Sequence, residues 1–178
     1  MIFARWRQRR AARALIDHIH GEIVAAARAP TLYADCGVPD DLDGRFEMVA
    51  LHADLALRRL NALGASELAQ ELVDRVFEGF DDALREMAVG DAGVAKRMTK
   101  MAGAYFGRAR AYAPALEAAD APALAEALAR NALRAPEATP KARRLAERAL
   151  ATQALLAGTP LQAFQAPSFR YPLPEIAP

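Results

Sequence analysis

The chain has 178 residues, of which 53% are hydrophobic and 25% are charged, and its formal net charge is +1 with a pI of about 7.9. This length fits one domain with a substantial core, and the near-neutral balance excludes an overall electrostatic attraction to nucleic acid, so any charge argument must be local. Much of the apolar content is alanine, the strongest helix former, and β-branched residues are few, which predicts an all-α fold. The single cysteine, Cys36, excludes an internal disulfide and a cysteine-rich zinc site.

A first helix is predicted up to the residues before Pro30, because apolar residues recur every three or four positions at Ala12, Ile16, Ile19, Ile23 and Ala26. Its leading end is basic and carries Arg5, Arg7, Arg9, Arg10 and Arg13 before the first acid. No run of about 18 apolar residues is present to cross a membrane, and the start of the chain lacks the apolar core of a secretory signal. Residues 30–44, with two prolines, two glycines and four aspartates, are expected to form a loop.

The second predicted helix, Arg45–Leu63 with Asp43 as its N-cap, is apolar on two sides. One apolar stripe contains Phe46, Val49, Ala53, Leu57 and Leu60, and the other contains Met48, Leu51 and Leu55. A helix of this kind has partners on both flanks, so we expect it at the centre of the fold. Two polar seams separate the stripes, and they consist of Arg45, His52 and Arg59 and of Glu47, Asp54 and Arg58.

The remaining chain predicts further helices and a proline-rich tail. Ser66 begins a third helix that Gly79 breaks, and Asp81 or Asp82 caps a short fourth one. Gly90 and Asp91 form a turn and N-cap for a long helix to Tyr112. A sixth helix follows Asp120 up to about Leu133, and a seventh begins at Thr139 and Pro140 and ends at Gly158. We therefore predict a single-domain bundle of about six to seven helices over residues 1–158.

Residues 159–178 are rich in proline and are not expected to be helical. Phe164, Phe169 and Tyr171 make this tail an extended arm that either packs on the bundle or binds a partner.

No motif of catalysis, metal binding or phosphate binding is complete. His18 and Glu22 have the spacing of two ligands on one helix, which is too few for a metal site. His52 is expected to lie at the surface or in a polar seam. The aspartates of residues 40–43 lack the further oxygen ligands of a calcium loop. We predict no catalytic residue, no metal site and no cofactor.

Charge is distributed unevenly between two neighbouring segments. Residues 66–91 contain eight acidic and two basic residues, whereas residues 92–112 contain five basic residues and no acid. On a helical wheel the five lie on one broad side, together with Gly103 and Gly107, where a neighbouring backbone could approach. These basic residues are Lys96, Arg97, Lys100, Arg108 and Arg110.

Two interpretations of this basic face are open. The charges pair with the acidic helices or stay solvated, since exposed ion pairs contribute only about 0–1 kcal/mol each. Alternatively, the face docks an anionic partner such as ribosomal RNA, lipid headgroups or an acidic protein. Tyr105, Phe106 and Tyr112 lie mainly on the opposite, apolar side, which argues against an RNA-binding regulator.

Two segments resemble signatures of a known family. DGRFEMVALHADLALRRL, from Asp43 to Leu60, and LREMAVGDAGVAKRMTKMAGAYFGRARAY, from Leu84 to Tyr112, are similar in order and separation to those of the ubiquinol–cytochrome c chaperone family. The lead-in LYADCGVPD is also similar, and the resemblance covers about Leu32 to Leu116. The residues that carry it include Asp43, Gly44, Arg45, Phe46, Glu47, His52, Leu84, Arg85, Glu86, Gly90, Asp91, Tyr105, Phe106, Gly107 and Tyr112.

The resemblance implies a helical, non-enzymatic assembly factor of the cytochrome bc1 complex, of bacterial type and acting on the cytoplasmic side of the membrane, or mitochondrial if the source is eukaryotic. The implied partners are nascent or newly inserted cytochrome b, the ribosome or an anionic membrane surface, and a small helper subunit, but no DNA. The basic face would dock this machinery with the N-terminal arginines assisting. The segments that contain Arg45 and Arg85 would either contact the client directly or be structural, with Arg45 or Arg85 bridging acids at helix crossings.

The alternative is a small helical protein or enzyme that binds a lipid, a quinone or haem. A deep apolar pocket lined by His52 would favour this alternative. A solid core with a broad groove would favour the chaperone.

Overall fold

The computed structural model describes residues 2–87 and 90–175, without the side chains of residues 2–9, 91 and 92. Within these ranges there are eight helices and no strand, which confirms the all-α, single-domain fold. The helices are α1 Ile2–Ala27, α2 Pro30–Ala34, α3 Leu42–Ala62, α4 Ser66–Glu86, α5 Asp91–Glu117, α6 Ala121–Asn131, α7 Pro140–Ala157 and α8 Leu161–Phe164. No helix in the described ranges is both long and apolar enough to cross a membrane.

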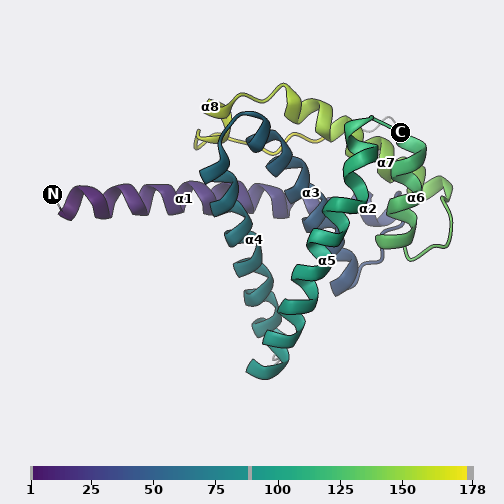
Figure 1. Cartoon of the computed structure of the whole chain (residues 1–178), viewed down its shortest axis with the longest axis horizontal. Helices are drawn as coiled ribbons and strands as arrows, with labels where there is room; N and C mark the ends of the chain where they lie inside the picture. Colours follow the sequence, from purple (N-terminus) through teal and green to yellow (C-terminus); the bar gives the residue numbers. More distant parts are fainter. Residues whose placement is uncertain (1, 88–89, 176–178) are drawn as a thin grey trace.

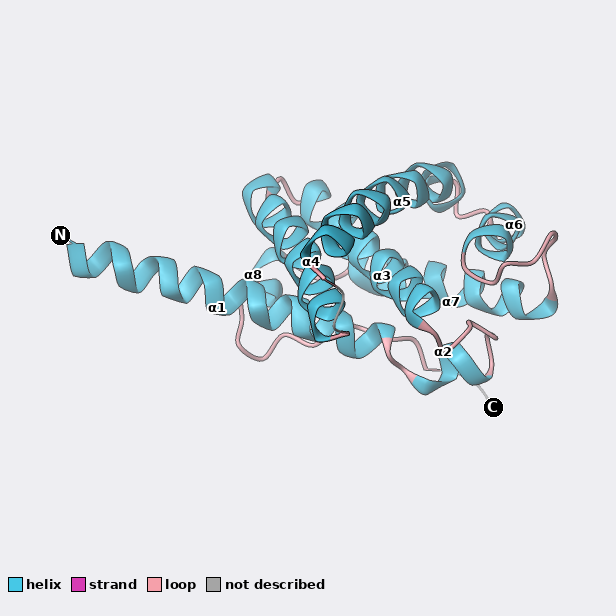
Figure 2. Ribbon diagram, turned by 90° about the horizontal axis from the view of Figure 1, so that it is seen from below, coloured by secondary structure: helices cyan, strands magenta, loops and turns pink. Residues whose placement is uncertain are grey.

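Helix α3 lies at the centre of the bundle, as its two apolar stripes predict. It packs against α1, α4, α5 and α7, which surround it in Figures 1 and 2. Met48 and Leu51 from one stripe and Ala53 and Leu60 from the other are all buried. Burial on both sides explains why this helix carries so few exposed positions.

The start of α3 differs from the prediction in its capping residue. Asp41, not Asp43, is the N-cap, and its side chain accepts a hydrogen bond of 2.8 Å from the backbone N–H of Gly44. The loop before the helix lies directly on this first turn, so that a Cβ at Gly44 would stand 1.9 Å from the carbonyl oxygen of Pro39. Only glycine leaves room for that backbone.

The segment expected to be a loop contains the short helix α2. Pro30 occupies its first turn, where a missing N–H costs nothing, and Leu32 is buried in the core.

The predicted break at Gly79 is wrong, because α4 continues through it to Glu86 without a separate fourth helix. A Cβ at Gly79 would lie 2.9 Å from two atoms of the His20 ring. The glycine therefore accommodates the crossing of α1 and α4, and this tertiary contact outweighs its low helix propensity of about 1 kcal/mol. Burial lowers the pKa of His20 to about 4.

Helix α5 begins after Gly90, which is the N-cap, and extends beyond Tyr112 to Glu117. Pro114 lies inside its last turns. Figure 1 shows α4 and α5 as a hairpin that projects from the body, and α1 as a helix whose first half extends away from it.

The segment after α7 crosses α1 and α3, and it includes a short helix where none was expected. Phe164 and Phe169 stack with ring centroids 4.8 Å apart, and both are buried. The hydroxyl of Tyr171 donates to the carbonyl oxygen of His52 at 2.9 Å, and Nε2 of His18 donates to that of Phe169 at 3.1 Å. Of the two predicted roles for these aromatic residues, the structure shows packing on the bundle.

Candidate functional site: a groove between α3, α5 and α6

A groove of about 660 Å³ lies between the first turns of α3, the first half of α5 and the end of α6. Its floor is apolar and its rim is charged. The apolar residues are Leu42, Phe46, Leu84, Met101 and Ala104. The polar residues are Asp41, Asp43, Glu47, Arg97, Lys100, Arg108, Arg130, Asn131 and Arg134. Its volume lies within the range of about 300–1,000 Å³ that is typical of ligand sites.

One wall of the groove is fixed by Asp41, which caps α3 and also binds Arg134. Both carboxylate oxygens accept from the guanidinium, each at 2.8 Å. This bidentate pair lowers the pKa of Asp41 and joins the segment after α6 to the start of α3. Arg134 has a φ of 54°, so it leaves α6 in the left-handed region and turns toward α3.

A second part of the lining is fixed by a partly buried ion pair between Glu47 of α3 and Arg108 of α5. Nη2 of Arg108 lies 2.8 Å from Oε1, and Nε lies 3.0 and 3.1 Å from the two oxygens. The Glu47 side chain is 7% exposed and that of Arg108 is 29% exposed. Burial raises the pKa of Glu47, and the paired guanidinium opposes that shift.

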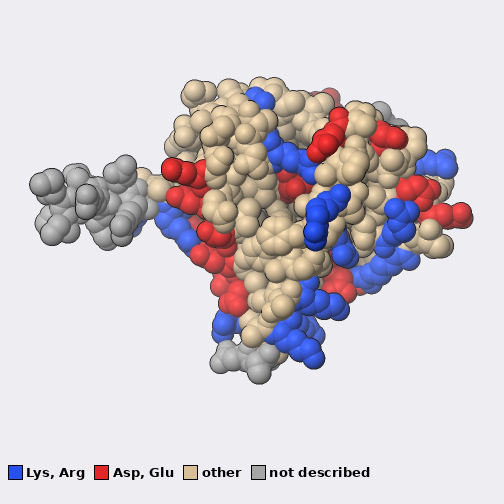
Figure 3. All heavy atoms as spheres, in the orientation of Figure 1, with Lys and Arg blue, Asp and Glu red and all other residues tan. Residues whose placement is uncertain are grey.

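Arg97 and Lys100 are exposed on the rim and form no ion pair with any described residue. The other cations of the groove have acidic partners. Arg130 lies 3.5 Å from Glu126, one turn earlier in α6, and Arg108 and Arg134 are paired as described above. In Figure 3, basic side chains gather over α5 on the side away from α4, whereas acidic ones follow the outer edge of α4.

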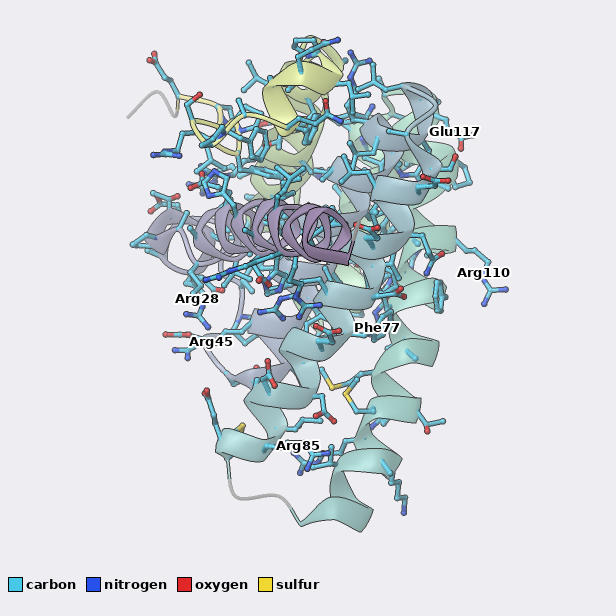
Figure 4. The ribbon with its side chains drawn as sticks, turned by 90° about the vertical axis from the view of Figure 1, so that its left-hand side faces the viewer. Arg28, Arg45, Phe77, Arg85, Arg110 and Glu117 are labelled. Atoms are coloured by element: carbon cyan, nitrogen blue, oxygen red, sulfur yellow. The ribbon has the colours of Figure 1, made fainter. Side chains whose placement is uncertain are left out.

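The five basic residues predicted to form one docking face are therefore divided by the structure. Arg97, Lys100 and Arg108 line the groove, whereas Lys96 and Arg110 do not. Arg110 points away from the body in Figure 4 and donates to the carbonyl oxygen of Phe106 at 3.3 Å. Among the described residues, none of the five pairs with an acid of α4: Arg108 pairs with Glu47 of α3, and the other four are exposed, so both the solvated and the docking interpretations stay open for them.

Two of the five arginines at the start of α1, Arg10 and Arg13, have described side chains. Arg13 pairs with Glu78 of α4 and lies 3.5 Å from Asp17. Arg10 is exposed, and the side chains of Arg5, Arg7 and Arg9 lie outside the described part of the structure.

The signature residues separate into groove and core. Asp43, Phe46, Glu47 and Leu84 line the groove, although they come from segments about 40 residues apart in the chain. Gly44 lies in the first turn of α3, where it leaves room for the backbone of Pro39. The two segments thus meet at one place.

The aromatic signature residues of α5 have two environments. Tyr105 and Tyr112 are buried, and burial raises the pKa of both hydroxyls. Phe106 is 50% exposed rather than on the buried side, with its ring centroid 6.0 Å from that of Phe77. No described atom outside the local helix lies within 4 Å of a Cβ at Gly103 or Gly107, so no described backbone occupies the space that these glycines leave.

Arg45 and Arg85 form short-range pairs in the described contacts. Arg45 donates to Asp40 in the preceding loop at 2.8 Å and points outward in Figure 4. Arg85 donates to Asp81 of its own helix at 2.6 Å, and Glu86 is exposed.

His52 is buried, not at the surface or in an open seam. It is 3% exposed, its Nδ1 donates to the carbonyl oxygen of Met48 at 2.8 Å, and burial lowers its pKa to about 4. It does not line the groove. Among the described residues, no group of three or more acidic, histidine or cysteine side chains could hold a metal ion.

Sequence reasoning did not identify Asp41, Arg130 or Arg134 as parts of the site. Asp41 had a usable signal, because an aspartate three positions before a helical N–H is a typical N-cap. Arg134 had none, since it follows the last helical position of α6 and its partner lies 93 residues earlier.

The comparisons with known proteins concern the family and the overall fold. Residues 34–171 match the family described as Ubiquinol-cytochrome C chaperone, a range that includes all of the groove-forming helices. The crystal structure of the Cbp3 homolog from Brucella abortus is similar over 96% of both chains, with 40% sequence identity and a TM-score of 0.82. No curated protein matches the chain. On the family match and the structural similarity together, this chain belongs to the ubiquinol–cytochrome c chaperone family.

Proposed function

We propose that this protein is a non-enzymatic assembly factor of the cytochrome bc1 complex, which binds newly made cytochrome b on the cytoplasmic side of the membrane. The family and a bacterial structural relative support a chaperone role. The observation that carries the proposal is the convergence of both signature segments on one open groove with two unpaired cations.

The exposed basic residues of α5 provide the docking surface in this proposal. Lys96, Arg97, Lys100 and Arg110 are all exposed and are free to meet an anionic partner at the ribosome or the membrane. Arg108 contributes differently, because its guanidinium is held by Glu47 and keeps α5 in position.

Deletion of the gene, followed by immunoblotting of cytochrome b and assay of ubiquinol–cytochrome c reductase activity, tests the function. Both are expected to fall and to return with the wild-type gene. Normal cytochrome b and normal activity in the deletion strain would refute the proposal.

The docking surface has its own test by complementation. A variant with Lys96→Glu, Arg97→Glu and Lys100→Glu is expected to fold but to fail to restore cytochrome b, and to lose co-sedimentation with ribosomes or membranes. The control reverses Arg143 and Arg144, two exposed arginines of α7 that do not line the groove. If both variants restore cytochrome b equally, the basic residues of α5 are not the docking surface.

A further inference from the structure

We propose that the groove binds an acidic peptide segment that carries an apolar side chain, with Arg97 and Lys100 pairing with its carboxylates. This inference rests on the proposed function for its choice of a protein client, and it names the chemistry by which that client would be recognised.

The first argument is the pairing of charges around the groove. Three of its five cations already have acidic partners within the chain, at 2.8 Å for Arg108 and Arg134 and at 3.5 Å for Arg130. Arg97 and Lys100 have none among the described residues. Because they lie one helical turn apart on α5, they face the same side and can bind two carboxylates or one carboxylate from both sides.

The second argument is the apolar floor beneath these cations. Met101 and Ala104 follow Arg97 and Lys100 on the same face of α5, and both remain partly exposed, whereas Phe46 and Leu84 close the floor from α3 and α4. A ligand with charge alone would leave this surface in contact with water. A ligand with an apolar side chain beside its carboxylates covers it, and methionine adapts to side chains of different shape.

The third argument favours a peptide over nucleic acid or lipid. Asp43 stands on the rim with a side chain that is 85% exposed, and its nearest basic partner is 3.8 Å away. A phosphate backbone would be repelled there, whereas a peptide N–H can donate to this carboxylate. Phe46 is the one aromatic residue of the groove lining and is 7% exposed, so no ring is available for stacking on bases. A concave site also fits a chain segment better than the plane of a bilayer.

The fourth argument is the rigidity of the walls. The Asp41–Arg134 and Glu47–Arg108 pairs are both bidentate and join α3 to α5 and to the segment after α6. Such a site requires little ordering when a ligand binds, so a short segment can bind with useful affinity.

The test measures fluorescence anisotropy of labelled peptides with the purified full-length protein. One set consists of overlapping peptides from the water-exposed segments of cytochrome b of the same organism. The other consists of designed peptides that alternate glutamate with leucine, each paired with a version in which glutamine replaces glutamate. The acidic peptides are expected to bind, and their glutamine versions are expected to bind about tenfold more weakly or not at all.

Two variants of the protein locate the binding site. Arg97→Glu with Lys100→Glu is expected to weaken binding of the acidic peptides by about tenfold or more. Arg143→Glu with Arg144→Glu, which makes the same change in charge on α7, is expected to leave it unchanged. Binding should also weaken as NaCl rises from about 0.1 M to about 1 M, because the screening length falls from about 10 Å to about 3 Å. Circular dichroism of both variants establishes that they fold.

Several outcomes would overturn the inference. Equal binding of glutamate and glutamine peptides would show that charge is not recognised, and equal loss in both double variants would place the site elsewhere. Direct binding of labelled poly-uridine RNA or of phosphatidylglycerol vesicles that is lost in the Arg97→Glu, Lys100→Glu variant, with no binding of any acidic peptide, would assign the groove to that other anion.

The designed peptides separate this inference from the function of the protein. If deletion lowers cytochrome b but no acidic peptide binds, the inference is wrong and the chaperone function stands. If deletion leaves cytochrome b normal while acidic peptides bind at Arg97 and Lys100, the function is wrong and the chemistry of the groove stands.

Discussion

Replacing Glu47 by alanine is expected to lower the free energy of unfolding by about 2 kcal/mol. Removing one partner of a fully buried ion pair costs about 3–5 kcal/mol, whereas an exposed pair contributes about 0–1 kcal/mol. The Glu47–Arg108 pair lies between these limits, because Glu47 is 7% exposed and Arg108 is 29% exposed. For a chain of this length, 2 kcal/mol corresponds to a fall in Tm of about 4–8 °C.

The measurement is urea unfolding followed by circular dichroism, with a double-mutant cycle of Glu47→Ala and Arg108→Ala. We expect a coupling energy of about 1–2 kcal/mol, because each single variant leaves the other charge without its partner. Replacing both residues by leucine and methionine should be close to neutral, since well-packed apolar residues often replace buried pairs without loss.

Arg97→Ala is the control, because Arg97 lies on α5 like Arg108 but has no ionic partner among the described residues. Its effect on stability should stay within about 0.5 kcal/mol. If Arg97→Ala and Glu47→Ala destabilise equally, or if the cycle shows no coupling, then the Glu47–Arg108 pair does not hold α5 against α3.

Three further predictions concern stability. Gly44→Ala should destabilise the protein by about 1–3 kcal/mol, because the added methyl group would overlap backbone atoms. Gly103→Ala meets no neighbour and should stabilise the protein by about 0.5–1 kcal/mol. Urea unfolding measures both variants, and equal changes in the free energy of unfolding would show that Gly44 is not crowded by the backbone of Pro39. His20 and His52 have pKa values lowered to about 4, so the unfolded chain binds protons before the folded one as pH falls. The free energy of unfolding should therefore decrease by about 2 kcal/mol per histidine between pH 7 and pH 5. A free energy of unfolding that stays constant over that window would show that neither ring is buried in its neutral form. Tyr171→Phe removes a buried hydrogen bond of 2.9 Å, which should lower the free energy of unfolding by about 1–2 kcal/mol and speed proteolysis of residues 159–175. An unchanged rate of cleavage would mean that this hydrogen bond does not hold the segment on the bundle.

The helices and the central position of α3 were predictable from periodicity because burial on two sides leaves two apolar stripes in one segment. The stripes containing Met48 and Leu60 show this directly. The family was predictable because its signature residues follow one another along the chain. Both kinds of information are local, and local information is what a single sequence carries best.

The groove was only partly predictable because its electrostatics depend on pairs distant in the chain. Glu47 and Arg108 are 61 residues apart, and no periodicity connects them. On a helical wheel, Arg108 therefore has the same properties as Lys100, although one is held by a carboxylate and the other faces open space. Gly79 was misjudged for a related reason, since its role depends on His20, in another helix.

The segment after α7 sets a constraint on the order in which this chain can complete its structure. Tyr171 is synthesised 119 residues after His52, and Phe169 is synthesised 151 residues after His18. At about 5–20 residues per second, α3 waits about 6–24 s for the residue that covers His52. During that interval the surface of α1 and α3 that the segment later covers is exposed to solvent, and exposed apolar surface promotes aggregation. A protein proposed to protect a newly made membrane protein therefore passes, during its own synthesis, through a stage with incompletely covered apolar surface.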